Sequence, residues 1–232
     1  MLASKLYEGR VAVLVEGTPF VLYVPYLFSD NFQSLDDYDY PPFFGGFVRL
    51  LKYFSFGISV FLPGVYVALG TFHQELIPTN LLFTIASAEF RTPLSLMNEA
   101  IMTLIFYEIM REAGLRLPNP ISDTVSIIGA LIVGQSAVEA KVISPIAVIV
   151  VATAGIAGYA QPSQDMSAAL RVCRLALVAA AILAGLFGVA AALCILIWYL
   201  CTMYSYGVNY TAPLSGGRPN NLSRTFLRKP LP

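Results

Sequence analysis

The chain has 232 residues and no net charge, with 57% hydrophobic and only 12% charged residues. Soluble domains carry about 25% charged residues, so this composition argues against a soluble enzyme or binding domain. Zero net charge also gives no reason to expect a nucleic-acid partner. From residue 143 to 202 the only charged side chains are Asp165, Arg171 and Arg174. Such a segment requires either lipid or a core larger than this chain could build.

Two apolar, β-branched runs within residues 10–24 flank Glu16-Gly17 and predict a β-hairpin. Both runs are almost wholly apolar, and an isolated hairpin is marginal in water, so another domain or a partner chain is expected to cover it. Residues 26–45 mix aspartates with aromatic residues, and we expect them to form a linker at a membrane surface.

Residues 46–204 are predicted to form an all-α polytopic membrane domain with about four full transmembrane helices. About 20 apolar residues are needed to cross a hydrocarbon core of about 30 Å. The segments with this character are roughly 47–72, 122–139, 145–160 and 167–204. Pro63-Gly64 predicts a kink in the first segment. As one straight helix the last segment would exceed about 50 Å, so it must project or kink, with Gly185 and Gly188 as candidate weak points.

An amphipathic or re-entrant region is predicted between the first two of these spans. The apolar run within residues 75–91 is too short to cross a bilayer. Residues 93–113 are expected to form a helix that Thr92 caps and Gly114 ends. This helix is unusually polar, so it either lies in the membrane interface or faces a wet cavity.

The distribution of lysine and arginine predicts the orientation of the chain. Four full spans place both termini on one side, together with nine of the 14 Lys and Arg residues, Lys141 among them. The other five, which include Arg91, Arg171 and Arg174, fall on the opposite side. The excess places both termini in the cytoplasm, where residues 205–232 form a loose, basic tail.

Three polar residues of the 93–113 helix are candidates for an ion pathway: Asn98, Glu99 and Glu108. A charge at the bilayer centre costs at least about 2.5 kcal/mol, so buried carboxylates without a role are expected to be rare. If these helices line a shared pore, the two carboxylates would form rings that attract cations. Alternatively, both face water at the membrane surface, or Glu108 forms a local ion pair with Arg111.

Small residues recur every four positions on two of the predicted helices, at Ser126, Ala130 and Gly134 and again at Ala154 and Gly158. This spacing lets helix backbones approach closely in lipid, so helix packing is the expected role of these residues.

The remaining reactive side chains predict neither a metal site nor a cofactor. Cys173, Cys194 and Cys201 form no CxxC pair and are expected to be buried, reduced, small apolar groups. His73 has no second histidine and no nearby cysteine. No Gly-rich phosphate loop precedes a helix, and no Ser/His/Asp set is apparent, so we do not expect an enzyme.

Six stretches in chain order resemble the A-subunit type of the GerA family of spore germination proteins. They are residues 8–21, 62–69, 73–79, 111–118, 125–138 and 206–213. The resemblance implies a multi-pass subunit of a germinant receptor in the spore inner membrane. It also implies B- and C-type partner subunits, assembly into a homo-oligomer and participation in ion release on nutrient sensing.

Members of this family normally carry a large amino-terminal cytoplasmic domain, and residues 1–45 would be the remnant of that domain. The chain is then a fragment, a truncated product or a split subunit. Two other functions fit the same sequence. A secondary transporter acting alone would explain the broken apolar segments. A structural scaffold that anchors partner subunits would need only the small-residue helix faces.

Overall fold

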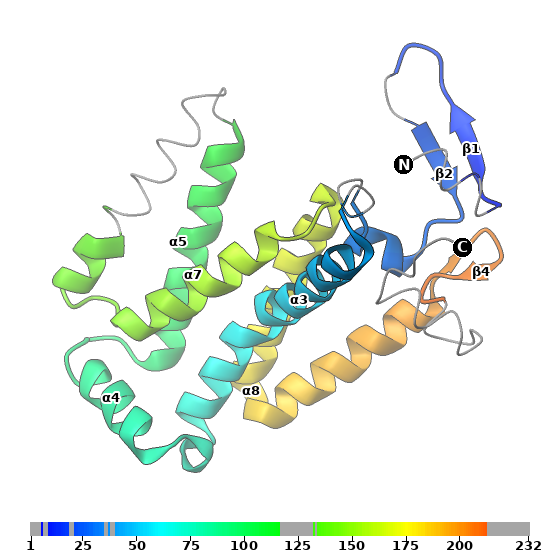
Figure 1. Cartoon of the computed structure of the whole chain (residues 1–232). Helices are drawn as coiled ribbons and strands as arrows, with labels where there is room; N and C mark the ends of the chain where they lie inside the picture. The colour runs from blue at the N-terminus through cyan, green and yellow to red at the C-terminus, as the bar shows by residue number, and fades with distance from the viewer. Residues whose placement is uncertain are drawn as a thin grey trace. The chain divides into compact units, whose positions relative to one another are not determined.

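The computed structural model describes residues 9–18, 21–34, 40–116 and 134–212, together with Leu6, Asp37 and Ile132 (Figure 1). The described chain is mostly helical. The helices are α3 (Pro42–Thr71), α4 (Thr79–Glu89), α5 (Leu96–Arg116), α7 (Pro145–Tyr159) and α8 (Gln164–Thr202), with the short 3₁₀ helices η1 (Phe28–Phe32) and η2 (Gln74–Leu76). The strands are β1 (Val11–Leu14), β2 (Val21–Val24), β3 (Tyr204–Ser205) and β4 (Val208–Asn209). The predicted span at 122–139 lies mostly outside the described residues.

Contacts divide the chain into two compact units. The first unit comprises residues 1–55, 160–167 and 194–232, and the second comprises 56–159 and 168–193. The core of the second unit is built from apolar side chains of several helices, among them Val67, Leu104, Val151, Leu177 and Ala181. Tyr107, one of the residues of the candidate site, packs against this core.

The predicted hairpin at 10–24 is confirmed. β1 and β2 pair antiparallel, with Val11 opposite Val24 and Leu14 opposite Val21, and Gly17 supplies a positive φ of 86° in the turn. Val11 and Leu14 stay largely exposed within the described chain. The hairpin therefore still presents the apolar surface for which a covering domain or partner was expected.

A second, shorter hairpin forms where a loose tail was expected from residue 205. β3 and β4 pair antiparallel around Tyr206-Gly207, and both turn residues have positive φ, as a type I′ turn requires. The prediction of a loose tail is therefore wrong for residues 205–209.

α3 begins at Pro42, five residues before the predicted start, and ends one residue before the predicted end. Proline suits the first turn of a helix because its missing N–H would have no intrahelical partner there. α3 continues as one helix through Pro63, as membrane helices tolerate. Residues 43–71 are long and apolar enough to cross a membrane.

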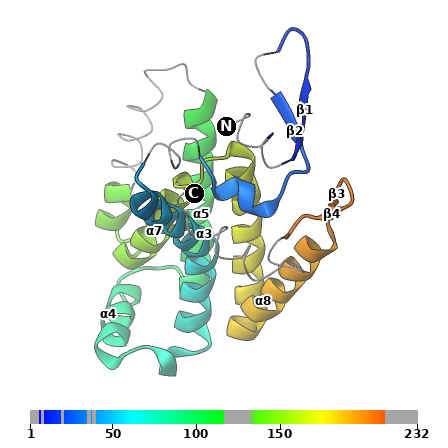
Figure 2. The ribbon, with the colours of Figure 1, turned by 45° about the vertical axis from the view of Figure 1, so that its right-hand side comes forward.

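α8 is broken at the position that the sequence predicts. Ser163 caps the helix by accepting a hydrogen bond from the Met166 N–H at 3.1 Å. Near its middle, Gly185 adopts φ 60° and ψ −141°, a conformation that favours glycine. A Cβ at Gly188 would overlap the Ala180 carbonyl oxygen, although residues eight apart in a straight helix are separated by about 12 Å. The chain therefore folds back sharply, as Figures 1 and 2 show.

Within the described part of the chain, two helices meet the length and apolarity needed to cross a membrane: residues 43–71 and 165–202. α7 is apolar but has only 15 residues. The predicted number of four full transmembrane helices is thus not reached by the described residues. The break at Gly185 also divides the second of these helices into two arms.

The predicted bounds and surroundings of the 93–113 helix are wrong. The Thr92 hydroxyl does not cap a helix but donates to the Glu89 carbonyl at 3.0 Å, which closes the turn after α4. α5 accordingly begins at Leu96 and continues two residues past Gly114. Its polar residues do not share one wet face, because Glu99 is fully buried whereas Asn98 is exposed.

The cysteine prediction is only partly right. All three cysteines are free thiols, but Cys173 is half-buried and both Cys194 and Cys201 are exposed. The physical reason is that the second arm of α8 presents most of its apolar side chains outward, as Ile195 and Trp198 also show.

Candidate functional site

One arginine of α8 lies fully buried in the second unit. The Arg174 side chain is 0% exposed. Its Nε–H donates to the Ser59 carbonyl oxygen at 3.0 Å, and its Nη2 donates to the Ser59 hydroxyl at 2.9 Å and the Ala154 carbonyl oxygen at 3.4 Å. Two other helices, α3 and α7, thus supply neutral acceptors to the guanidinium from α8.

A third helix brings a carboxylate toward the same arginine. Glu108 of α5 places Oε1 3.8 Å from Arg174 Nη1, and its Oε2 lies 3.8 Å from Nη1 of Arg171. Within the described residues, neither Arg174 Nη1 nor Glu108 Oε1 has a hydrogen-bond partner. The two opposite charges attract, but they stop short of the distance of about 2.8 Å for a charge-assisted hydrogen bond.

An aromatic ring also faces the arginine. The Arg174 guanidinium lies 5.6 Å from the centre of the Tyr107 ring, within range of a cation–π interaction. Gly155 makes room for that ring, because a Cβ at this position would overlap Tyr107. We call Ser59, Tyr107, Glu108, Ala154, Gly158 and Arg174 the Arg174 cluster.

The small residues of α7 lie against this cluster. Ala154 is fully buried, and a Cβ on Gly158 would lie 3.1 Å from the Ser59 hydroxyl and 3.5 Å from Arg174 Nη2. Their lack of side-chain bulk leaves space for the arginine as well as for the neighbouring helix. A Cβ at Gly134 would meet nothing within 4 Å among the described residues. Ser126 and Ala130 lie outside the described residues.

Glu99 occupies a different place, at the amino end of α7. Its Oε1 accepts a hydrogen bond from the Ser144 N–H, and the Ser144 hydroxyl in turn accepts from the Ala147 N–H at 3.2 Å. A carboxylate is favoured at a helix amino terminus because the N–H groups and the helix dipole attract negative charge. Glu99 is fully buried, so in this chain it ties α5 to the start of α7.

The three predicted pathway residues therefore do not meet in one place. Glu99 lies against Ser144, Glu108 lies against Arg171 and Arg174, and Asn98 is exposed. The sequence analysis missed Ser59 and Arg174. Two arginines, Arg171 and Arg174, near the start of a long apolar run were the available signal for Arg174, because burying a charge in such a segment is costly.

A second set of buried ionic contacts lies in the first unit. The Lys52 ammonium donates to both carboxylate oxygens of Asp37, at 2.7 and 2.9 Å, and to the Ser34 hydroxyl at 2.8 Å. Arg10 pairs with Asp30 in two contacts. Both carboxylates come from the segment predicted to be a linker, and both are buried.

Asn31 joins three distant parts of the first unit. Its Oδ1 accepts from the Tyr26 hydroxyl at 2.8 Å and from the Ser163 hydroxyl at 3.1 Å, and its Nδ2 donates to the Tyr210 hydroxyl at 3.1 Å. Burial raises the pKa of both Tyr26 and Tyr210, so both phenols stay protonated at neutral pH. These contacts bring Ser163, which lies between α7 and α8, together with residues that precede α3 and residues that follow α8.

Within the described residues, no group of three or more His, Cys, Asp or Glu side chains has the arrangement of a metal site.

Comparisons with known proteins cover the whole chain. The family model described as Bacillus/Clostridium GerA spore germination protein matches residues 1–232. Spore germination protein KA of Bacillus subtilis (strain 168) is 41% identical over 99% of this chain and 42% of its own length. Spore germination protein B1 of the same organism is 37% identical over 98% of this chain and 47% of its own length. Spore germination protein GerLA of Bacillus cereus is 36% identical over 98% of this chain and 46% of its own length.

The chain spans less than half the length of each of these relatives. No solved structure matches it. The match to the family model along all 232 residues, together with these identities, shows that the chain belongs to the GerA family of Bacillus/Clostridium spore germination proteins.

Proposed function

We propose that this chain is the membrane-embedded part of a germinant receptor subunit that works with B- and C-type partner subunits and takes part in ion release. The observation that carries the proposal is the match to the GerA family over the entire chain. The relatives reported above are named spore germination proteins. Homo-oligomerisation belongs to the same proposal, because a pore lined by α5 would need more than one copy.

The distribution of polar and apolar side chains supports a place in a membrane. On α8, Arg174 is buried while Leu183 and Phe187 are 82% and 78% exposed. On α5, Glu99 is buried while Ile105 and Ile109 are exposed. Apolar side chains outside and charges inside are the arrangement that lipid favours, because an unpaired charge facing hydrocarbon is costly.

Two contacts support an arrangement other than four spans. Arg91 and Lys141 line one cavity, although four spans place them on opposite sides. Ser163 and Tyr210 both bond to Asn31, although four spans separate the segment between α7 and α8 from both termini. The count of four leaves out α5, which has 21 residues and a length of about 31 Å, and it takes α8 as one span.

Six crossings agree with both contacts. They are α3, α5, the predicted segment 122–139, α7 and the two arms of α8. Six is again an even number, so both termini stay on one side. That side then holds eleven of the 14 Lys and Arg residues, Arg174 lies near the middle of the first arm of α8, and the opposite side holds only Arg91 and Lys141. So large an excess supports a cytoplasmic location of the termini through the positive-inside rule.

Thiol labelling tests this topology. In a chain whose three cysteines are changed to serine, single cysteines at Glu139 and Pro162 would be treated with a membrane-impermeant maleimide. Six crossings predict that Glu139→Cys reacts from the outside and Pro162→Cys only after permeabilisation. The opposite pattern would restore the arrangement of four spans.

For the ion pathway, the geometry favours Glu108 over Glu99. Glu108 is partly exposed and lies near two arginines without a hydrogen bond to Arg174, whereas Glu99 is fully enclosed and bonded to Ser144. A small movement of α5 or α8 would therefore change the surroundings of Glu108 first. Asn98, exposed on the same helix, is the third candidate.

The proposed function is tested in spores that carry the variant gene. Glu108→Gln is expected to slow potassium release after nutrient addition, with the amount of protein in the spore membrane unchanged. Glu112→Gln, one turn later and more exposed, is the matched control. Normal potassium release in the Glu108 variant would remove this carboxylate from the pathway. A scaffold would be favoured by a different result: deletion of the chain removes the partner subunits from the membrane, and no polar variant changes potassium release.

A further inference from the structure

A cavity of about 520 Å³ opens in the second unit between α4 and the segment that leads into α7. α4 and the turn after it contribute Thr84, Ser87, Ala88, Arg91 and Thr92 to the lining, and the facing segment contributes Val138, Glu139, Lys141, Ile143, Pro145 and Ile146. Its volume is in the range of about 300–1,000 Å³ that is typical of small-molecule sites.

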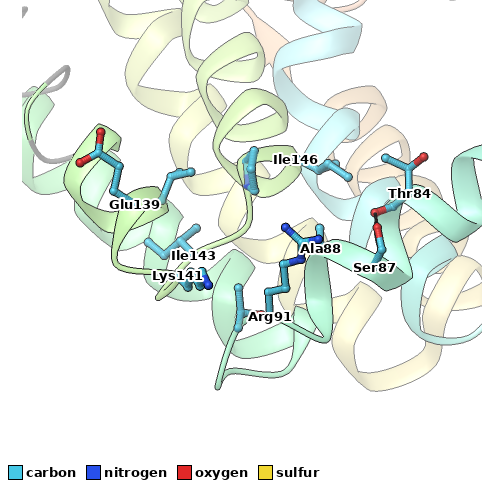
Figure 3. A pocket seen from close by; sticks show the side chains of 11 residues that line it. Thr84, Ser87, Ala88, Arg91, Glu139, Lys141, Ile143 and Ile146 are labelled. Carbon is cyan, nitrogen blue, oxygen red and sulfur yellow. Dashed lines mark hydrogen bonds between the residues drawn. The ribbon is translucent and has the colours of Figure 1, made fainter.

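Two cations reach into this cavity from its opposite walls. Figure 3 shows Arg91 and Lys141 extending into the same space, whereas the Glu139 carboxylate points away from both. This step rests on the proposed topology with six crossings. In that topology Arg91 and Lys141 are the only Lys and Arg residues on the side of the membrane opposite the termini. Their convergence on one cavity is therefore not the result of a generally basic surface.

The backbone at Lys141 is strained in a way that places this side chain. The N–H groups of Lys141 and Val142 bond to the carbonyls of Val138 and Ala137, which is the Schellman pattern at a helix end. The residue at this position adopts φ 57°, where glycine is the favoured residue. Because a lysine occupies a position where glycine would relieve strain, its ammonium is a candidate for function.

The remaining lining explains what kind of anion fits. The Thr84 and Ser87 hydroxyls donate to helix carbonyls of Asn80 and Thr84, so recognition of an anion falls to the two cations. Ala88, Ile143 and Ile146 supply apolar walls. On the outer faces of α4 and the turn after it, Leu81, Phe83 and Phe90 are exposed. An anionic group attached to apolar chains matches both features.

We propose that this cavity binds a phosphate group, held between the Arg91 guanidinium and the Lys141 ammonium. Phosphate suits such a pair because the guanidinium offers paired donors and the ammonium adds a point charge. The apolar walls favour the head group of an anionic phospholipid over free phosphate as its source.

The test uses the full chain, purified in neutral detergent and titrated calorimetrically with short-chain phosphatidylglycerol, short-chain phosphatidylcholine and inorganic phosphate. Wild type is expected to bind phosphatidylglycerol most tightly. Lys141→Gly and Arg91→Gln should each weaken binding about tenfold, since each removes one charge-assisted contact. Lys141→Gly should also keep or raise the thermal unfolding midpoint, because glycine relieves the strain. Glu139→Gln, which removes the nearby carboxylate, should leave binding unchanged or tighter.

Inorganic phosphate that binds as tightly as phosphatidylglycerol would support the phosphate site and assign it to the free ion. Phosphatidylglycerol binding that survives in the Arg91→Gln/Lys141→Gly double variant would overturn the proposal. Titration in detergent does not depend on which way the chain crosses a membrane. A wrong topology would therefore change the thiol labelling and leave this result as it is.

Discussion

Lys52 and Arg174 are two buried cations that the chain stabilises in different ways. Lys52 makes two hydrogen bonds to the Asp37 carboxylate, at 2.7 and 2.9 Å, so charge meets charge directly. Arg174 makes its hydrogen bonds to neutral acceptors on Ser59 and Ala154, and its nearest carboxylate is 3.8 Å away. A close ion pair holds its two side chains in one geometry. An arginine whose hydrogen bonds go to neutral acceptors can have a carboxylate nearby that is not hydrogen-bonded to it.

This difference assigns the two cations different roles. The Lys52 pair lies in the first unit with other contacts that join distant segments, and it is suited to hold a fixed structure. The Arg174 cluster joins four helices and contains two opposite charges about 1 Å too far apart to bond. Such a cluster is suited to change when its helices move, as the proposed part in ion release would require.

The largest expected effect comes from breaking the close pair. In Asp37→Ala the buried Lys52 ammonium loses its carboxylate and keeps, among the described residues, the hydrogen bond to the Ser34 hydroxyl. Removing one partner of a buried ion pair lowers the free energy of unfolding by about 3–5 kcal/mol. Thermal unfolding in detergent measures the loss, and Glu75→Ala, at an exposed acid, is the control. A loss as small as in the control would show that the pair does not hold the first unit.

Sequence patterns predicted the elements of the fold that depend on local chemistry. Two apolar, β-branched runs around Glu16-Gly17 predicted the first hairpin, and a glycine in a helix too long for a membrane predicted the break at Gly185. The start of α5 was missed because the Thr92 hydroxyl bonds back to Glu89 and not into the helix that follows. A capping pattern does not show whether the hydroxyl accepts from the N–H groups of the following helix or donates to the preceding turn.

The site depended on contacts that no local pattern contains. Arg174 takes its acceptors from Ser59, 115 positions earlier, and from a backbone carbonyl of α7. The sequence did identify Glu108, Ala154 and Gly158 as notable, but for separate reasons, as a charge and as small packing residues. Their place around one arginine follows from the packing of helices, which a single sequence does not specify.

Loss of the Ser59 hydroxyl tests whether neutral acceptors support Arg174. In Ser59→Ala, Nη2 keeps only the longer bond to the Ala154 carbonyl. A hydrogen bond to a charged group is worth about 1.5–3 kcal/mol, so we expect a loss of about 2 kcal/mol in the free energy of unfolding. Ser55→Ala, one turn earlier on α3, removes the same hydroxyl elsewhere and should cost less. Equal losses would mean that the hydroxyl has no special role at Arg174.

Glu108→Gln should have a smaller effect on stability, although it is the variant expected to slow ion release. The Glu108 side chain is 20% exposed and makes only 3.8 Å contacts to the arginines, so the expected loss is about 1 kcal/mol or less. A double-mutant cycle with Arg171→Gln separates the two ion pairs. If Glu108→Gln destabilised the chain as much as Asp37→Ala, the contrast between the two cations would be wrong.

A comparably small effect is expected from adding one methyl group beside the cluster. In Gly158→Ala the new Cβ would lie 3.1 Å from the Ser59 hydroxyl, so either that hydroxyl or the arginine must move by a few tenths of an ångström. We expect a loss of about 1 kcal/mol in the free energy of unfolding, the low end for overpacking.

Gly57→Ala is the matched control, since its Cβ would meet nothing within 4 Å among the described residues. Removing a glycine from the interior of a helix should stabilise that control by about 0.5–1 kcal/mol. Opposite signs for the two variants would show that α7 carries glycine at this position to make room for the Arg174 cluster. A gain in both would mean that the cluster is loose enough to accept a larger residue.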